Sequence, residues 1–270
     1  MCFEFHALPP RVPADRTIPA LIGGGAAAEI LTLESADGTE FSAALAECPE
    51  PTGGAAVIVL PDVRGLYRFY IDLAERFVTA GHHAVAIDYF GRTAGVGERD
   101  DSFDFMTHTM LTKPDQVQAD IAAARDLLAE RTGATMFVTV GFCFGGAQSD
   151  LAGTNSQLGL DGVVSFYGTL VARRVGADNL DFPAPLRHAD EIRTPVLALF
   201  GGDDPGIPPE DIAEFDAALS RSGIPHEIHT YPGAPHSFFD RSFEEHAEAS
   251  ADAWRRVLDF LGKVSAPAPA

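Results

Sequence analysis

The hydrophobic residues of this chain fall into two kinds of segment that alternate along the sequence. Residues 55–60, 160–167 and 195–200 are apolar runs, which are typical of strands buried on both faces of a sheet. Residues 69–80 and 114–130 instead carry apolar positions at helical spacing. The pattern therefore predicts strands and helices in alternation.

The remaining elements complete this pattern. Asp37-Gly38 is a turn signal between two short alternating segments, which predicts a β-hairpin near the start. An antiparallel start followed by repeated strand–helix units predicts an α/β fold with a mostly parallel central sheet and helices on both faces. The other predicted strands are 29–34, 40–46, 83–88, 135–141 and 226–231, and the other predicted helices are 145–151, 209–221 and 242–262.

The chain is predicted to form one domain with short extensions. Residues 1–28 contain four prolines and predict an irregular N-terminal arm, residues 29–262 are expected to form the α/β domain, and residues 263–270 are an Ala-Pro-rich tail that we expect to be flexible. Two long stretches without clear periodicity, 91–113 and 168–193, both follow strands. We expect them at the carboxyl edge of the sheet, where such folds bind ligands. In the first stretch, Phe103, Phe105, Met106 and His108 are equally compatible with a pocket lining and with loop packing.

Composition narrows the classes of function. Nineteen basic and thirty-nine acidic residues give a net charge of −20, which disfavours nucleic-acid partners and favours solubility. No stretch approaches the roughly 20 apolar residues of a membrane span, and the N-terminus lacks the features of a signal peptide. Cys2, Cys48 and Cys143 fit neither a disulfide framework nor a metal motif. We therefore expect a cytoplasmic protein without a bound metal, as a monomer or a homodimer.

The strand at 135–141 leads into the segment G-F-C-F-G, centred on Cys143. A sharp strand-to-helix turn of this kind exposes its central side chain, and Gly141 and Gly145 remove side chains that would collide across it. The N-terminus of the following helix favours a thiolate, and its amides, beginning with Phe144, could stabilise an oxyanion. The segment predicts a cysteine nucleophile, although a buried and inert cysteine is the alternative.

A cysteine nucleophile needs a base, and the base needs a carboxylate that orients it. The strand at 195–200 ends in Gly-Gly-Asp-Asp, which offers Asp203 and Asp204, and the strand at 226–231 is followed by His236. Nucleophile, acid and histidine thus follow three strand ends in the order that this kind of fold requires. Spacing alone does not distinguish Asp204 from Asp203.

At these residues the sequence resembles the dienelactone hydrolase family of α/β hydrolases. The resemblance covers roughly residues 29–262 and is most specific at G-F-C-F-G-G, G-G-D-D-P-G-I-P and A-P-H-S-F. It implies that Asp204 is the catalytic acid and that His236 is the catalytic histidine, with Pro235 replacing the glycine that is usual before it.

The resemblance implies three further roles. Asp62 matches an acidic residue that holds the resting thiol, although it is one methylene shorter than the usual glutamate, and the amide of Val63 would be the second oxyanion donor. Arg92 matches an arginine that grips a substrate carboxylate. The family's second arginine is replaced here by Asp240, with Arg241 next to it, so dienelactone itself is less well supported as the substrate than the family scaffold.

The expected activity is the hydrolysis of small carboxylic esters or lactones by a Cys143–His236–Asp204 triad, which requires no cofactor. A second hypothesis is that the same triad acts on thioesters, peptides or phosphotriesters. A third hypothesis is that the chain is a redox-sensing or ligand-binding protein that uses only the thiol.

Overall fold

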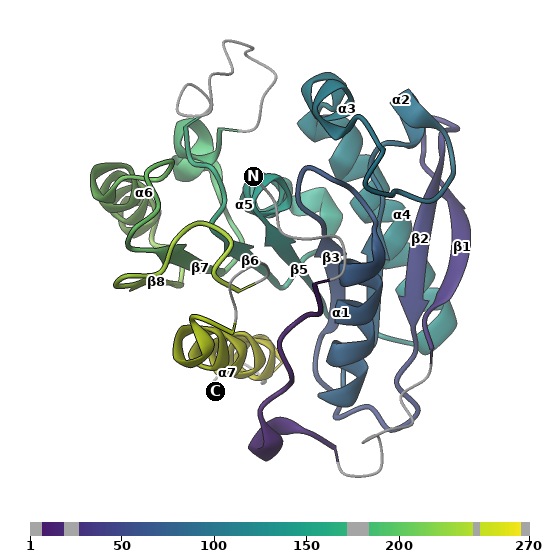
Figure 1. Cartoon of the computed structure of the whole chain (residues 1–270), viewed down its shortest axis with the longest axis horizontal. Helices are drawn as coiled ribbons and strands as arrows, with labels where there is room; N and C mark the ends of the chain where they lie inside the picture. Colours follow the sequence, from purple (N-terminus) through teal and green to yellow (C-terminus); the bar gives the residue numbers. More distant parts are fainter. Residues whose placement is uncertain (1–6, 19–26, 172–183, 240–243, 266–270) are drawn as a thin grey trace.

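The structure is a computed structural model that describes residues 7–18, 27–171, 184–239 and 244–265. In these ranges eight strands form one mixed sheet in the order β1-β2-β4-β3-β5-β6-β7-β8 (Figure 1). The β1–β2 and β2–β4 pairs are antiparallel, and the remaining pairs are parallel. The predicted hairpin and the mostly parallel α/β sheet are confirmed. The strands are β1 (Glu29–Glu34), β2 (Glu40–Ala46), β3 (Ala56–Leu60), β4 (Ala84–Ile87), β5 (Phe137–Phe142), β6 (Gly162–Phe166), β7 (Val196–Gly201) and β8 (His226–Tyr231).

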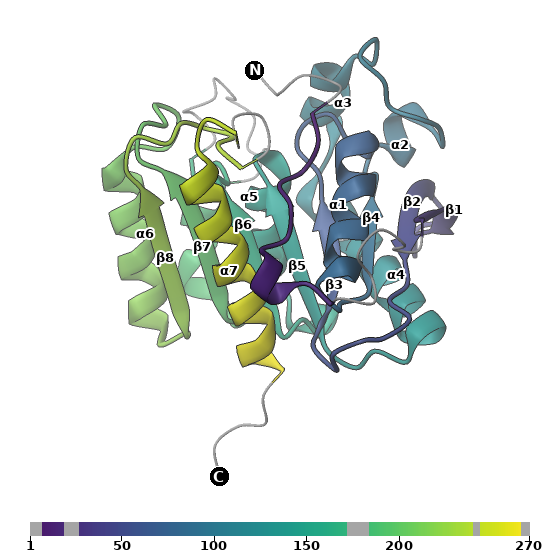
Figure 2. The same cartoon turned by 60° about the horizontal axis from the view of Figure 1, so that its bottom comes forward.

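Helices cover both faces of the sheet because its central strands are apolar on both faces. On β3, Val57 and Val59 pack into the same apolar cluster as the side chains of α1 and α7. Ile58 points the other way and packs with the buried side chains of α4. Figure 2 shows α1 and α7 on the near face of the sheet. The helices are α1 (Arg68–Thr79), α2 (Gly91–Ala94), α3 (Phe105–Leu111), α4 (Pro114–Thr132), α5 (Phe144–Ala152), α6 (Pro209–Ser222) and α7 (Ala247–Val264).

The described part of the N-terminal arm, residues 7–18, is anchored to the folded chain. It runs between α1 and α7 (Figure 2), and it contains a single 3-10 turn at Ala14–Arg16. The indole Nε1 of Trp254 donates a hydrogen bond of 3.1 Å to the carbonyl of Pro10, and Val12 is buried in the core. Residues 7–18 contain no α-helix and no strand.

Two sequence predictions need correction. The stretch 91–113, expected to be irregular, contains the short helices α2 and α3. With four and seven residues, they are too short for a helical period to show in the sequence. The closing helix begins at Ala247 rather than at 242, and it extends to Val264, so Lys263 belongs to the helix and not to a tail.

Parallel pairing brings the ends of six strands to one edge of the sheet. The carboxyl ends of β3, β4, β5, β6, β7 and β8 lie at this edge, because each of these strands runs parallel to a neighbour. The loops that follow them carry the residues that the sequence singled out. None of the described helices is both long enough and apolar enough to cross a membrane.

Candidate active site

Cys143 occupies a strained turn between β5 and α5. Its φ of 54° lies in the left-handed region that side chains rarely adopt. The turn is tight: a Cβ atom on Gly141 would lie 2.0 Å from the carbonyl oxygen of Gly145, and one on Gly145 would lie 2.2 Å from the carbonyl oxygens of Leu60 and Pro61. Both glycines are therefore required, as the sequence predicted. Cys143 is partly exposed while its neighbours in the turn are buried, so the turn presents the thiol at the carboxyl edge.

Asp204 and His236 are brought together by two loops that bond to each other. The amide of Gly202 donates to the carbonyl of Tyr231 at 2.8 Å, and the amide of Asp203 donates to the carbonyl of Ala234 at 2.9 Å. This alignment places Nδ1 of His236 2.6 Å from Oδ2 of Asp204. The Asp204 side chain is only 3% exposed, whereas Asp203 is exposed to solvent. Of the two candidate acids, Asp204 is the one that contacts the histidine.

The electrostatic environment of His236 favours its charged form. Burial of the ring by itself lowers its pKa. The negative charge of Cys143, together with hydrogen bonds to Asp204 and Cys143, outweighs burial and raises the pKa of His236 well above its usual value. The imidazole is thus coupled to Cys143 on one side and to Asp204 on the other.

This coupling predicts how the thiol reacts with an alkylating agent. Because the raised pKa of His236 favours the imidazolium, and a cation beside the sulfur assists its attack as a nucleophile, alkylation of Cys143 by iodoacetamide at neutral pH should be faster in the wild type than in His236→Ala. Peptide mass spectrometry of the alkylated protein measures both rates.

Cys48 provides an internal comparison in the same experiment. It is 4% exposed, and burial raises the pKa of its thiol, so it should react far more slowly than Cys143. Cys2 lies outside the described residues, and Cys143→Ser separates its labelling from that of Cys143. Equal rates at Cys143 and Cys48 would contradict an activated nucleophile.

The loop after β3, residues 61–66, lies against the Cys143 turn, and we call it the oxyanion loop. Val63 is partly exposed in it, and within the described part of the chain no acceptor bonds its amide N–H. The carboxylate of Asp62 is buried and is held by its own loop. Oδ1 of Asp62 accepts the backbone N–H of Arg64 at 2.9 Å, and Oδ2 lies 3.4 Å from the Arg64 guanidinium. Both carboxylate oxygens of Asp62 thus contact Arg64 of the same loop, and the expected contact with the resting thiol stays a prediction.

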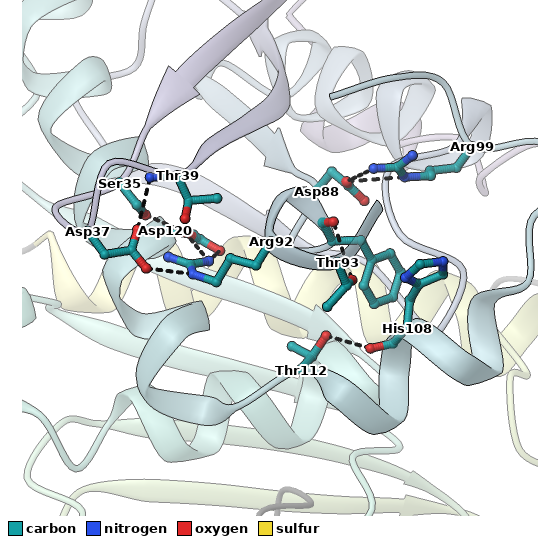
Figure 3. A network of polar contacts seen from close by, with 11 residues as sticks. Ser35, Asp37, Thr39, Asp88, Arg92, Thr93, Arg99, His108, Thr112 and Asp120 are labelled. Carbon is teal, nitrogen blue, oxygen red and sulfur yellow. Dashed lines mark hydrogen bonds and ion pairs between the residues drawn. The ribbon is translucent and has the colours of Figure 1, made fainter. Parts of the chain in front are cut away.

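Arg92 contacts two carboxylates of the protein itself. It belongs to α2, and Nε donates to Oδ2 of Asp37 at 2.8 Å, while one terminal nitrogen lies 2.9 Å from both oxygens of Asp120 (Figure 3). The Arg92 side chain is 10% exposed and Asp120 is fully buried. The guanidinium therefore links α2 to the β1–β2 hairpin and α4, and the substrate contact expected of Arg92 stays a prediction. Asp120 could not be recognised from the sequence because it lies within a helical pattern 28 residues away.

Two residues near Cys143 and His236 were missed by the sequence reasoning. Tyr167 follows β6 with a φ of 40°, and its ring centroid lies 5.0 Å from that of His236. Ser237, next to the histidine, has a φ of 61°. Together with Cys143, these are the described non-glycine residues with positive φ, and all three follow strand ends at the site. No sequence signal marks them, because left-handed conformations at Tyr and Ser are exceptions to local preference.

The arrangement defines a class of protein. A sheet of this order, a strained turn that carries a potential nucleophile, and a histidine–carboxylate pair on the loops after β7 and β8 are the features of an α/β hydrolase. No group of three or more side chains suited to hold a metal ion occurs in the described ranges.

Comparison with known proteins identifies the family. A sequence model of the dienelactone hydrolase family matches residues 41–265. The chain is 31% identical over 230 residues to a Yersinia pestis protein described as a candidate carboxymethylenebutenolidase, covering 83% of this chain and 84% of that one. The chain therefore belongs to the dienelactone hydrolase family and is a hydrolase.

Solved structures agree with this assignment. The crystal structure of a candidate dienelactone hydrolase from Klebsiella pneumoniae superposes with a TM-score of 0.71 at 27% identity, covering 87% of this chain and 99% of that chain. A dienelactone hydrolase-like promiscuous phosphotriesterase from metagenomic libraries superposes with a TM-score of 0.70 at 21% identity, covering 88% of this chain and 99% of that chain. The second likeness supports the fold alone.

Proposed function

We propose that this protein hydrolyses small, neutral carboxylic esters or lactones by acyl transfer through Cys143. The observation that carries the proposal is the 2.6 Å contact between His236 and Asp204, with the ring of His236 coupled to Cys143 on the strained turn. A protein that used only the thiol as a redox sensor would need neither the histidine nor the carboxylate.

The proposed reaction has two stages. The Cys143 sulfur attacks the carbonyl carbon, the thiol proton resides on His236, and the imidazolium then protonates the leaving alkoxide. Water, deprotonated by His236, hydrolyses the resulting thioester and returns the thiol. Asp204 accepts the Nδ1–H of His236, which fixes the tautomer and stabilises the cation. The amides of Phe144 and Val63 would bind the oxyanion of each tetrahedral intermediate.

The charges near the carboxyl edge favour a neutral substrate. Arg92, which could have bound a substrate carboxylate, is already paired with Asp37 and Asp120. Arg64 is paired with Asp62 and Arg99 with Asp88. A substrate carboxylate would have to compete with these internal acids, in a protein whose net charge is −20.

We therefore expect higher kcat/KM for a neutral ester such as p-nitrophenyl acetate than for a dienelactone that carries a carboxylate. Loss of a charge-assisted contact costs about 1.5–3 kcal/mol, so the preference should be roughly ten- to a hundredfold. Steady-state kinetics with both substrates measure this preference, and mass spectrometry of the quenched reaction should find the acyl group on the peptide that contains Cys143.

Arg241→Ala is the control for this prediction, because Arg241 neighbours the position where the family has its second arginine. Arg241 lies outside the described residues. A strong dienelactone preference that collapses in Arg241→Ala would contradict a neutral substrate while leaving the acyl-transfer mechanism intact. Hydrolysis of a thioester or phosphotriester in place of every carboxylic ester would support the alternative electrophiles. No acyl adduct and no hydrolysis would favour the sensor hypothesis.

A further inference from the structure

Tyr89 contacts the backbone of the oxyanion loop from the side of β4. It follows β4 directly and is 2% exposed, and its ring packs against that of Phe144 with centroids 5.4 Å apart. The hydroxyl oxygen lies 2.6 Å from the carbonyl oxygen of Asp62 and also contacts the carbonyl oxygen of Pro61. The phenol proton is therefore donated to loop carbonyls.

The bond to Asp62 acts on the peptide group that carries the proposed oxyanion donor. The carbonyl of Asp62 and the amide N–H of Val63 belong to one planar trans peptide, so the two groups point in opposite directions. A donor that fixes the carbonyl on the Tyr89 side thereby fixes the N–H on the opposite side. Donation to the carbonyl also polarises the peptide and makes its N–H a stronger donor.

The next peptide group of the loop is fixed in the same way. The hydroxyl of Thr109 on α3 shares its proton between the carbonyl oxygens of Val63 at 3.1 Å and Phe105 at 2.8 Å. The amide of Arg64 donates to Oδ1 of Asp62 at 2.9 Å. Both peptide groups that flank the Val63 Cα are thus held by side chains. Rotation of the Asp62–Val63 peptide would break a buried hydrogen bond, and rotation of the Val63–Arg64 peptide would break partly buried ones.

The end of the loop is held by a buried ion pair. Oδ1 of Asp88 accepts the amide of Leu66 at 3.2 Å, and Oδ2 of Asp88 accepts the terminal nitrogen of Arg99 at 2.8 Å (Figure 3). The same Arg99 nitrogen donates to the carbonyl of Gly95 at 2.6 Å. The segment from the end of β4 through α3 therefore holds the oxyanion loop by hydrogen bonds to its backbone.

We infer that Tyr89 is a positioning residue that orients the amide of Val63 as an oxyanion donor, with Thr109 as a second and weaker support. This inference rests on the proposed acyl-transfer function. Tyr89 touches no reacting atom, and it acts through the peptide group between Asp62 and Val63.

The test is the substitution Tyr89→Phe, which keeps the ring and removes only the hydroxyl. Complete loss of one oxyanion donor typically costs about 10²–10³ in kcat, so a misoriented donor should lower kcat for p-nitrophenyl acetate roughly ten- to a hundredfold. KM should change less than about twofold, because the donor strengthens mainly in the transition state. Thr109→Val should lower kcat about two- to tenfold, as expected for one neutral hydrogen bond.

The alkylation rate of Cys143 distinguishes a role of Tyr89 in orienting the oxyanion donor from a general structural effect on the site. The reaction of Cys143 with iodoacetamide forms no oxyanion, so Tyr89→Phe should leave its rate unchanged while ester turnover falls. Binding of a small aldehyde, whose thiohemiacetal places an oxygen in the oxyanion hole, should weaken about as much as kcat does. Tyr231→Phe is the matched control, since it removes a buried phenol that donates to Asp252 at 2.9 Å, away from the loop.

The outcomes separate this inference from the function on which it rests. Unchanged ester turnover in both Tyr89→Phe and Thr109→Val, in an active protein, would overturn the positioning role alone. An equal fall in alkylation and turnover would also overturn it, because the nucleophile itself would then be disturbed. If Tyr89→Phe does not fold, Thr109→Val decides by the same two readouts. A wild-type protein that hydrolyses none of the esters would overturn the proposed function, and this inference with it.

Discussion

Cys143→Ala, His236→Ala and Asp204→Asn are each expected to lower kcat/KM for a neutral ester by at least about a thousandfold while the protein stays folded. Cys143→Ala removes the nucleophile, and His236→Ala removes the group that carries its proton. Asp204→Asn keeps the shape of the side chain but presents an amide to Nδ1 of His236, which favours the wrong tautomer; in a serine protease such a change costs about 10⁴ in kcat. Ester kinetics together with circular dichroism measure both activity and folding.

The neighbouring acid provides the matched control for this series. Asp203 is exposed, and its backbone amide, rather than its side chain, bonds to the loop after β8. Asp203→Asn should therefore change kcat/KM by less than about threefold, within the usual range of surface substitutions. A larger loss in Asp203→Asn than in Asp204→Asn would show that the acid has been assigned to the wrong residue. Double variants should lose little more than single ones, since the three residues act as a unit.

Asp150→Asn is expected to stabilise the protein strongly at neutral and alkaline pH. Asp150 lies on α5 and is fully buried, and burial raises its pKa to about 8 against the opposing effect of the Ser165 hydroxyl. An unfolded chain would ionise this carboxyl near its ordinary value of 3.8. From about pH 4 to about pH 8, the folded state therefore holds a proton that the unfolded state has lost, and the free energy of unfolding falls as the pH rises.

Each pKa unit corresponds to about 1.4 kcal/mol, so the loss reaches several kcal/mol near pH 8 and is absent near pH 4. Asn has the same shape without the acid, so Tm of Asp150→Asn should exceed that of the wild type by several degrees near pH 8 and match it near pH 4. Calorimetry across this range measures the difference. Asp101→Asn, at an exposed position, is the control and should show no such pH dependence. A Tm difference that does not vary with pH would contradict a buried neutral carboxyl.

The sequence by itself determined the strands and the longer helices of the fold. Strands such as β3 and β7 are continuous apolar runs, and helices such as α4 carry their own caps, with Pro114 at the start and Gly133 after the end. These signals are local, because backbone periodicity depends on neighbours within a few positions. The turn at Cys143 was equally visible, since a strained conformation leaves glycines at fixed offsets. Cys143, Asp204 and His236 each follow a predicted strand, so the sequence alone indicated that they lie at the same edge of the sheet.

Only the tertiary structure decided what each polar side chain contacts. Arg92 looked like a substrate ligand from its local motif, but its partners Asp37 and Asp120 lie 55 and 28 residues away, on a hairpin and a helix that the sheet brings beside α2. The same holds for Tyr89, whose hydroxyl reaches loop carbonyls 27 and 28 residues earlier because β3 and β4 are adjacent in the sheet. A side chain's hydrogen-bond partner is set by topology and by the need to satisfy buried polar groups, and neither leaves a periodic trace in the sequence. The sequence therefore singled out Cys143, Asp204 and His236 as candidates, while the contacts of the side chains around them required the folded chain.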